Sequence, residues 1–289
     1  MMVSMAAFVV NDAVVKLASE NLSLFQVMFL RGIFSTILIG SFAWYKKQLF
    51  CHIPKVDLGK LGWRVVGEVG GTLCFLNALF NIPLANATAI LQSLPLAMTF
   101  GAALFLGETV GWRRYLAIAI GFCGMLIIVR PGSEGFNHYS YWAVAAVGFV
   151  VFRDLTTRRL TANVPSLFIA LLTSVAIMTT GAVLSPLTTW QPVTIQSLIY
   201  LMIASVFLMF GYLFSIMTIR IGEIGFAAPF RYTSLVWAII MGYLMFSDIP
   251  DRWTLLGSAI VIVMGIYTFH RERKQRIKAL DIRNDNQNA

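Results

Sequence analysis

The sequence predicts an all-α integral membrane protein with ten transmembrane helices, arranged as two inverted five-helix repeats. Of its 289 residues, 58% are hydrophobic and only 12% are charged, whereas soluble domains carry about 25% charged residues. Apolar stretches of about 18–25 residues recur along the chain, which is the length that crosses a bilayer as a helix. Segments of the first half also recur in the second. This composition excludes a soluble enzyme.

Ten apolar stretches are the expected spans. The first begins without a basic n-region, so we expect a membrane span there rather than a cleaved signal. It is short, and we expect the natural start of the chain to lie further upstream. The spans cover residues 2–18, 24–44, 62–80, 82–107, 113–130, 139–157, 165–185, 194–219, 222–246 and 252–270.

Basic residues predict the orientation. With the N-terminus in the cytoplasm, seventeen of the 22 Lys and Arg residues fall on the inner side, and only Lys16, Arg130 and Arg252 fall on the outer side. Inner loops of membrane proteins carry an excess of Lys and Arg, so we expect both termini in the cytoplasm of a bacterial inner membrane. The net charge of +9 then needs no nucleic-acid partner.

The two halves match in order. NDAVVKLASENLSLF, from residue 11, resembles RDLTTRRLTANVPSLF, from residue 153, so that Asp12 is equivalent to Asp154. Further pairs are Gly107 with Ser247, Trp112 with Trp253, and Gly124 with Gly265. Because each repeat has five spans, the second is inverted relative to the first, as in many secondary transporters. The expected units are residues 1–137, residues 138–270 and a basic cytoplasmic tail, 271–289.

Two arginines lie inside expected spans. At about 1.5 Å per residue, Arg31 lies about 12 Å and Arg231 about 14 Å from the nearest membrane surface. A charge at this depth needs a carboxylate, backbone carbonyls, water or a ligand. Arg31 forms either an ion pair with Asp12 or a ligand contact. For Arg231 we favour substrate contact, because the matching helix of the other repeat has no arginine.

The surroundings of Arg231 suit a flat ligand. Phe230, Tyr232 and Trp237 are candidates to flank such a molecule, although aromatic residues in spans more often pack or face lipid. Pro229 is expected to kink this span, and Pro95 to kink residues 82–107 at a different height. Gln92, near Pro95, lines the cavity or joins two helices.

Glu68 and Asp12 are the candidates for proton coupling, since burial raises the pKa of an acid. The alternative for Glu68 is a structural ion pair with Arg31 or Arg231. Gly67 and Gly71, on either side of it, predict a close helix contact. The three cysteines lack metal or redox spacing, and no histidine lies in an expected span. We therefore expect no metal site and no cofactor.

At this point the residues resemble a known family. The NDAVVK start, Gly107-Glu108 closing the fourth span, the Phe29-Leu30-Arg31 region and the APFRY run from residue 228 are similar to the drug/metabolite transporter superfamily, EamA-domain branch. One similar subgroup includes rickettsial S-adenosylmethionine importers, and riboflavin importers belong to the wider family. This chain departs from the pattern at Ser247, where glycine is usual.

The resemblance implies alternating access around a central cavity, driven by protons or a counter-substrate. We therefore expect a secondary active transporter for S-adenosylmethionine, riboflavin or a similar zwitterionic or heteroaromatic solute, acting as a monomer or homodimer in the lipid bilayer. One alternative is an exporter of amino acids, metabolites or drugs. An alternative of another class is a non-transporting membrane receptor. No catalytic motif is present, so we do not expect an enzyme.

Overall fold

The computed structural model describes residues 1–48, 53–107, 111–131, 137–161, 164–221 and 228–288, and this part of the chain is entirely helical or connecting. Short 3-10 turns cover Ser185–Leu187 (η1) and Ala228–Tyr232 (η2). The α-helices are α1 Met2–Ala18, α2 Leu24–Tyr45, α3 Lys55–Asn81, α4 Leu84–Leu91, α5 Leu94–Leu106, α6 Trp112–Val129, α7 Ser140–Arg158, α8 Ser166–Leu184, α9 Ile195–Ile221, α11 Thr233–Phe246 and α12 Arg252–Asn288. The predicted all-α class is confirmed.

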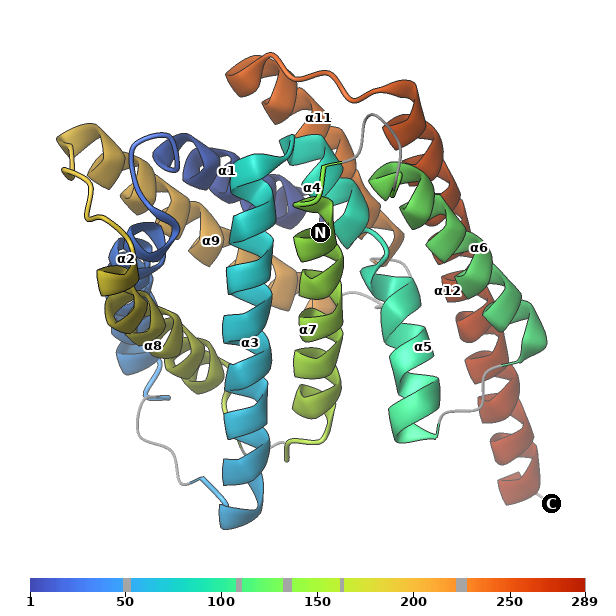
Figure 1. Ribbon diagram of the computed structural model, residues 1–289. Helices are drawn as coiled ribbons and strands as arrows, with labels where there is room; N and C mark the ends of the chain where they lie inside the picture. Colours follow the sequence, from blue (N-terminus) through green and yellow to red (C-terminus); the bar gives the residue numbers. More distant parts are fainter. Residues whose placement is uncertain (49–52, 108–110, 132–136, 162–163, 222–227, 289) are drawn as a thin grey trace.

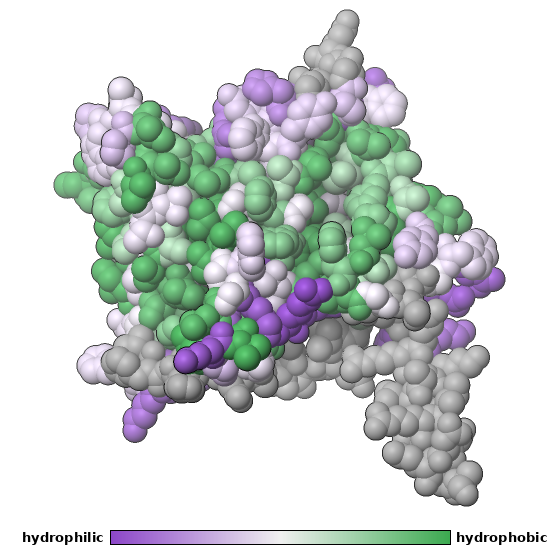
Figure 2. Space-filling view, turned by 60° about the horizontal axis from the view of Figure 1, so that its bottom comes forward, coloured by the Kyte–Doolittle hydropathy of each residue, from purple (hydrophilic) through white to green (hydrophobic). Residues whose placement is uncertain are grey.

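The surface is that of a membrane protein. Figure 2 shows a broad hydrophobic band, with hydrophilic residues gathered above and below it. Residues Phe230–Phe246 form a shorter apolar helix. Six described segments are long and apolar enough to cross a bilayer, namely Leu24–Tyr45, Leu84–Leu106, Trp112–Val129, Ser166–Leu187, Ile195–Phe214 and Arg252–Arg271.

The helices pack across the two halves in pairs. Helix α3 packs on α7 and α1 on α9, while α2 packs on α8 and α6 on α12 (Figure 1). Exchanging the halves relates α1 to α7 and α3 to α9. Under this exchange the contact of α3 with α7 becomes the contact of α9 with α1. The contacts of α2 with α8 and of α6 with α12 are unchanged. This is the pattern that two related repeats produce when they pack around a two-fold axis. The boundaries at residues 137 and 270 stay predictions.

Two of the expected spans are interrupted. Residues 82–107 divide into α4 and α5, with Gln92 and Ser93 between them. In the span 222–246, residues 222–227 lie outside the described part, η2 covers 228–232, and α11 begins at Thr233. Each proline lies in a first helical turn or a 3-10 turn, where proline is tolerated.

The interruptions are at equivalent positions, which corrects the expectation of different heights. The break at Gln92 and the η2–α11 junction at Tyr232 are 140 residues apart, the same separation as Gly107 and Ser247. A proline permits a helix break nearby but does not determine the residue at which the helix breaks. The positions of Pro95 and Pro229, which are not equivalent in the two halves, were therefore misleading. Gly107 (φ 67°) and Ser247 (φ 55°) end α5 and α11 in the same left-handed conformation. Serine adopts this conformation at a steric cost that glycine avoids.

Close packing of α3 on α7 confirms the contact predicted for Gly67 and Gly71. A methyl group on Gly67 would lie 3.0 Å from Cβ of Arg153 and 3.1 Å from its Cα. Gly71 faces Phe149 and Val150. Small residues allow two helix backbones to approach in this way. Arg153 is therefore inside a helix contact, although its charge was counted with the seventeen on the inner side.

Candidate functional site

The two interrupted helices are joined by Gln92. Its Nε2 donates to the carbonyl oxygen of Tyr232 at 3.1 Å and to Oγ of Ser234 at 2.8 Å. Gln92 ends α4 and is only 6% exposed. A helix end leaves backbone groups without intrahelical partners, and here a side chain of one repeat satisfies a carbonyl at the break in the other. Gln92 therefore joins the two helices, which was one of its two expected roles.

A cavity of about 510 Å³ lies beside this junction. Arg231 and Tyr232 line it, together with residues of α5, α6, α7 and α12. Arg114 is in the first turn of α6 and Arg158 is the last residue of α7, so the cavity reaches the end of the molecule where the seventeen basic residues are expected. Its charged lining residues are Arg114, Arg153, Arg158, Arg231 and Asp154. Among the described residues that line the cavity, arginines therefore outnumber acidic residues by four to one.

The side chain of Arg231 is exposed toward this space. Among the described residues it has no ion pair or side-chain hydrogen bond, and its carbonyl accepts from Oγ of Ser234 at 2.9 Å. Beside it, the hydroxyl of Tyr232 is buried and has no hydrogen-bond partner in the described part of the chain. A methyl group on Gly265 would collide with this hydroxyl. Gly265 thus leaves the room in α12 that places Tyr232 at the cavity wall.

Two other predicted site residues are elsewhere. Trp237 packs against the hydrophobic core, and neither it nor Phe230 is among the residues that line the cavity. Phe230 is partly buried, and its carbonyl accepts from Oγ1 of Thr233 at 2.6 Å. The aromatic residues that do line the cavity are Tyr232 and Phe269.

Arg31 and Glu68 line a smaller space of about 70 Å³ with Tyr212. Arg31 and Asp12 interact electrostatically, but the described residues include no ion pair between them within 4 Å. The carboxylate of Asp12 accepts instead from Nδ2 of Asn11 at 2.8 Å. The expected direct ion pair is therefore absent from this part of the structure.

Glu68 pairs with two arginines that lie in expected spans but were counted with the basic residues of the inner side. Nη1 of Arg153 donates to Oε1 of Glu68 at 2.9 Å, and Nε donates to Asp154 at 2.8 Å. Nη2 of Arg64 lies 3.5 Å from Oε2 of Glu68. The expected partners, Arg31 and Arg231, are replaced by these two because Gly67 brings α7 against α3. The equivalence of Asp154 to the intramembrane Asp12 was the signal for this cluster.

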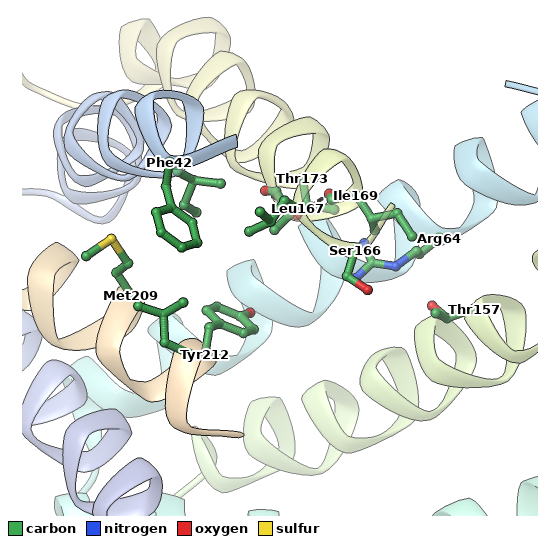
Figure 3. A pocket seen from close by; sticks show the side chains of 12 residues that line it. Phe42, Arg64, Thr157, Ser166, Leu167, Ile169, Thr173, Met209 and Tyr212 are labelled. Carbon is green, nitrogen blue, oxygen red and sulfur yellow. Dashed lines mark hydrogen bonds between the residues drawn. The ribbon is translucent and has the colours of Figure 1, made fainter. Parts of the chain in front are cut away.

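The two residues of the Glu68–Arg153 ion pair line different cavities. Arg153 lines the 510 Å³ cavity, whereas Glu68 lines the 70 Å³ space. A third cavity, of about 230 Å³, shares Ile39, Ala170, Thr173 and Tyr212 with that smaller space (Figure 3). The described residues contain no cluster of three or more His, Cys, Asp or Glu that would hold a metal.

Comparison with known proteins adds a family and several relatives. Residues 1–130 match the EamA-like transporter family. The chain is 26% identical over 282 residues to an S-adenosylmethionine uptake transporter of Rickettsia bellii, covering 96% of this chain and 95% of that protein. It is 29% identical over 276 residues to the pseudopaline exporter CntI of Pseudomonas aeruginosa, covering 90% of each.

A riboflavin transporter of Vibrio cholerae is 29% identical over 222 residues, covering 75% of this chain and 74% of that protein. A solved crystal structure matches with a TM-score of 0.64 and 16% identity, covering 94% of this chain and 96% of the other. At this identity the structural match shows the fold alone.

Proposed function

We propose that the chain, whose residues 1–130 match the EamA-like transporter family, is a secondary transporter for a small organic solute that carries an anionic group. The observation that carries the proposal is Arg231, exposed to a 510 Å³ cavity beside the junction of two interrupted helices. Cavities of about 300–1,000 Å³ hold small organic ligands.

The charge of the lining supports an anionic group on the solute. Arg153 already has Glu68 and Asp154 as partners, whereas Arg231 has none among the described residues. A guanidinium binds a carboxylate or phosphate through two parallel hydrogen bonds. The ring of Tyr232 and that of Phe269 offer apolar faces for a flat part of the same molecule.

We propose a zwitterionic metabolite as the substrate, with S-adenosylmethionine as the first candidate. Riboflavin, which has a flat heteroaromatic ring system but no anionic group, is the alternative. Relatives named for the uptake of S-adenosylmethionine align with nearly the whole chain, and a relative named for riboflavin aligns with three quarters of it. S-adenosylmethionine has a carboxylate that suits Arg231 and an adenine ring that suits the aromatic wall.

Interrupted helices at equivalent positions support alternating access between the two repeats. For proton coupling we propose Asp12 rather than Glu68. Glu68 has two arginine partners, Arg153 and Arg64, and its charge is already compensated. The carboxylate of Asp12 has the Asn11 amide as its hydrogen-bond donor and no ion pair among the described residues.

Transport in membrane vesicles tests the proposal. Labelled S-adenosylmethionine, riboflavin and a panel of amino acids are offered to wild type, Arg231→Ala, Arg231→Lys and the control Arg252→Ala, at matched amounts in the membrane. Arg252 is exposed at the start of α12 and does not line the cavity. We expect Arg231→Ala to lower transport at least about tenfold, since a hydrogen bond to a charged group contributes about 1.5–3 kcal/mol, and Arg252→Ala to leave it unchanged.

Normal transport by Arg231→Ala would show that Arg231 is not part of the transport site. If the wild type binds the solute but does not transport it, the result would favour the alternative that the protein is a non-transporting membrane receptor.

Growth tests determine the direction of transport. The alternative, an exporter, is supported by the relative named as a pseudopaline exporter. Its sequence identity to this chain, 29%, is similar to that of the relatives named for uptake. An importer lets cells that lack the solute grow on external solute and sensitises cells to its toxic analogues. An exporter protects cells from those analogues. We propose import, and protection by overexpression would contradict it.

A further inference from the structure

The 230 Å³ cavity is separate from the Arg231 cavity. Its walls come from α2, α3, α7, α8 and α9, and it has only Thr157 in common with the larger cavity. Arg153 lines the Arg231 cavity, and its partner Glu68 lines the small space that shares four lining residues with the 230 Å³ cavity. A ligand here would not occupy the proposed transport site.

The lining of this cavity has an apolar side and a polar side. Figure 3 shows Phe42 and Met209 facing Arg64 and Ser166 across it. Further apolar residues are Leu167, Ile169 and Leu213. Arg64 is the one charged residue among the described residues that line it. The cavity therefore combines an apolar wall with a single positive charge.

Arg64 has donors that the protein does not use. Its Nη2 reaches Glu68 at 3.5 Å, but Arg153 holds the same carboxylate more closely, at 2.9 Å. Nε and Nη1 of Arg64 are buried and have no hydrogen-bond partner among the described residues, and the side chain is only 14% exposed. Buried polar groups in folded proteins nearly always have partners, and each exception needs a cause. These two atoms have almost no accessible surface, so an anionic ligand in the adjoining cavity becomes their acceptor only when the Arg64 side chain turns toward it.

We infer that this cavity is a second binding site, which takes a small amphiphilic anion: a carboxylate or phosphate on Arg64, with an apolar group against Phe42 and Met209. A volume of 230 Å³ is below the usual range for drug-sized ligands, about 300–1,000 Å³, so the buried part of the ligand is small. The same chemistry is offered by a free organic anion and by the headgroup region of an anionic lipid. The inference does not depend on the proposed substrate of the Arg231 cavity.

Binding to the full chain in phosphatidylcholine nanodiscs tests this site. The probe is 4-phenylbutanoate, and 4-phenylbutan-1-ol is the matched molecule without charge. We expect the chain with Arg64 intact to bind the carboxylate at least about tenfold more tightly than the alcohol, and Arg64→Gln to remove this preference. These measurements are made in the Arg231→Gln background, because the anion site proposed in the other cavity would also bind the carboxylate.

A second variant controls for damage to the charge cluster. Ala170 lines the cavity, and Ala170→Phe fills the space while leaving every charge in place, so it abolishes binding of both probes. Equal affinity for carboxylate and alcohol with Arg64 intact would overturn the site, as would unchanged carboxylate affinity in Arg64→Gln or no carboxylate binding at all. Discs that contain phosphatidylglycerol identify the source: displacement of the probe assigns the site to an anionic lipid, and unchanged binding assigns it to a free anion.

Discussion

At the scale of the residue, Arg31 and Arg231 have similar sequence signatures and different surroundings. Both lie deep in apolar runs without a partner nearby in the sequence. Arg31 borders a space of about 70 Å³ and interacts electrostatically with Asp12, Glu68 and Tyr212. Arg231 borders about 510 Å³ and has no ion pair among the described residues. Of the two arginines, Arg231 borders the larger space, and this supports the proposal that Arg231 contacts the substrate.

The pair Glu68–Arg153 gives a residue-scale prediction. Both side chains are mostly buried, 11% and 21% exposed. Removing one partner leaves the other charge uncompensated, and for a fully buried pair this costs about 3–5 kcal/mol. Because this pair is partly exposed, we expect Glu68→Gln to lower the free energy of unfolding by about 1–3 kcal/mol. Denaturant unfolding in detergent measures the change.

The matched variants separate the pair from its neighbours. Arg153→Gln is expected to have a similar effect, and the double variant Glu68→Gln with Arg153→Gln is expected to lose less than the sum of the two. Strictly additive losses would show that the two residues contribute independently and would contradict the pairing.

At the scale of the element, the interrupted helices depend on Gln92. Gln92→Ala leaves the carbonyl of Tyr232 and the hydroxyl of Ser234 without this donor. Because Gln92 does not line the cavity, we expect the affinity for solute to change less than about threefold. The rate of transport is expected to fall by about tenfold, since a lost hydrogen bond contributes about 0.5–1.5 kcal/mol to the position of the two helices.

Binding and flux are measured on the same preparation, with the neighbouring Ser93→Ala as control. Ser93 bonds only within its own helix turn, through the carbonyl of Ile90. A Gln92→Ala protein that transports normally would mean that the two breaks do not move as a unit.

Helices were more predictable than their contacts. Residues 2–18 and 24–44 became α1 and α2 almost unchanged, because an apolar run in a membrane protein has few alternatives to a helix. The break at Gln92 was expected only as a kink. Arg153 was not named as a site residue because its charge, near the end of an apolar run, was counted with the basic residues of the inner side. Its burial depends on α3 packing against α7, which the sequence indicates only through Gly67.

At the scale of the whole molecule, the helix pairs account for the cavities. The contacts α3 on α7 and α1 on α9 are related by exchange of the halves, but the charges are not. Arg231 has no arginine at its equivalent position, and Arg153, beside Asp154, is equivalent to Asn11 beside Asp12. A symmetric scaffold therefore holds an asymmetric, positively charged site. The basic residues predict that this site opens to the cytoplasm in the conformation described.

Access to the cavity from one side is the most direct test of this account. A cysteine at Thr99, which lines the cavity, is introduced after Cys51, Cys74 and Cys123 are replaced. A membrane-impermeant maleimide is then applied to inside-out and right-side-out vesicles. We expect faster labelling in inside-out vesicles, slowed by the solute that the vesicles transport and not slowed by it in Arg231→Ala. Labelling that a saturating transported solute leaves unchanged would contradict the assignment of this cavity as the transport site.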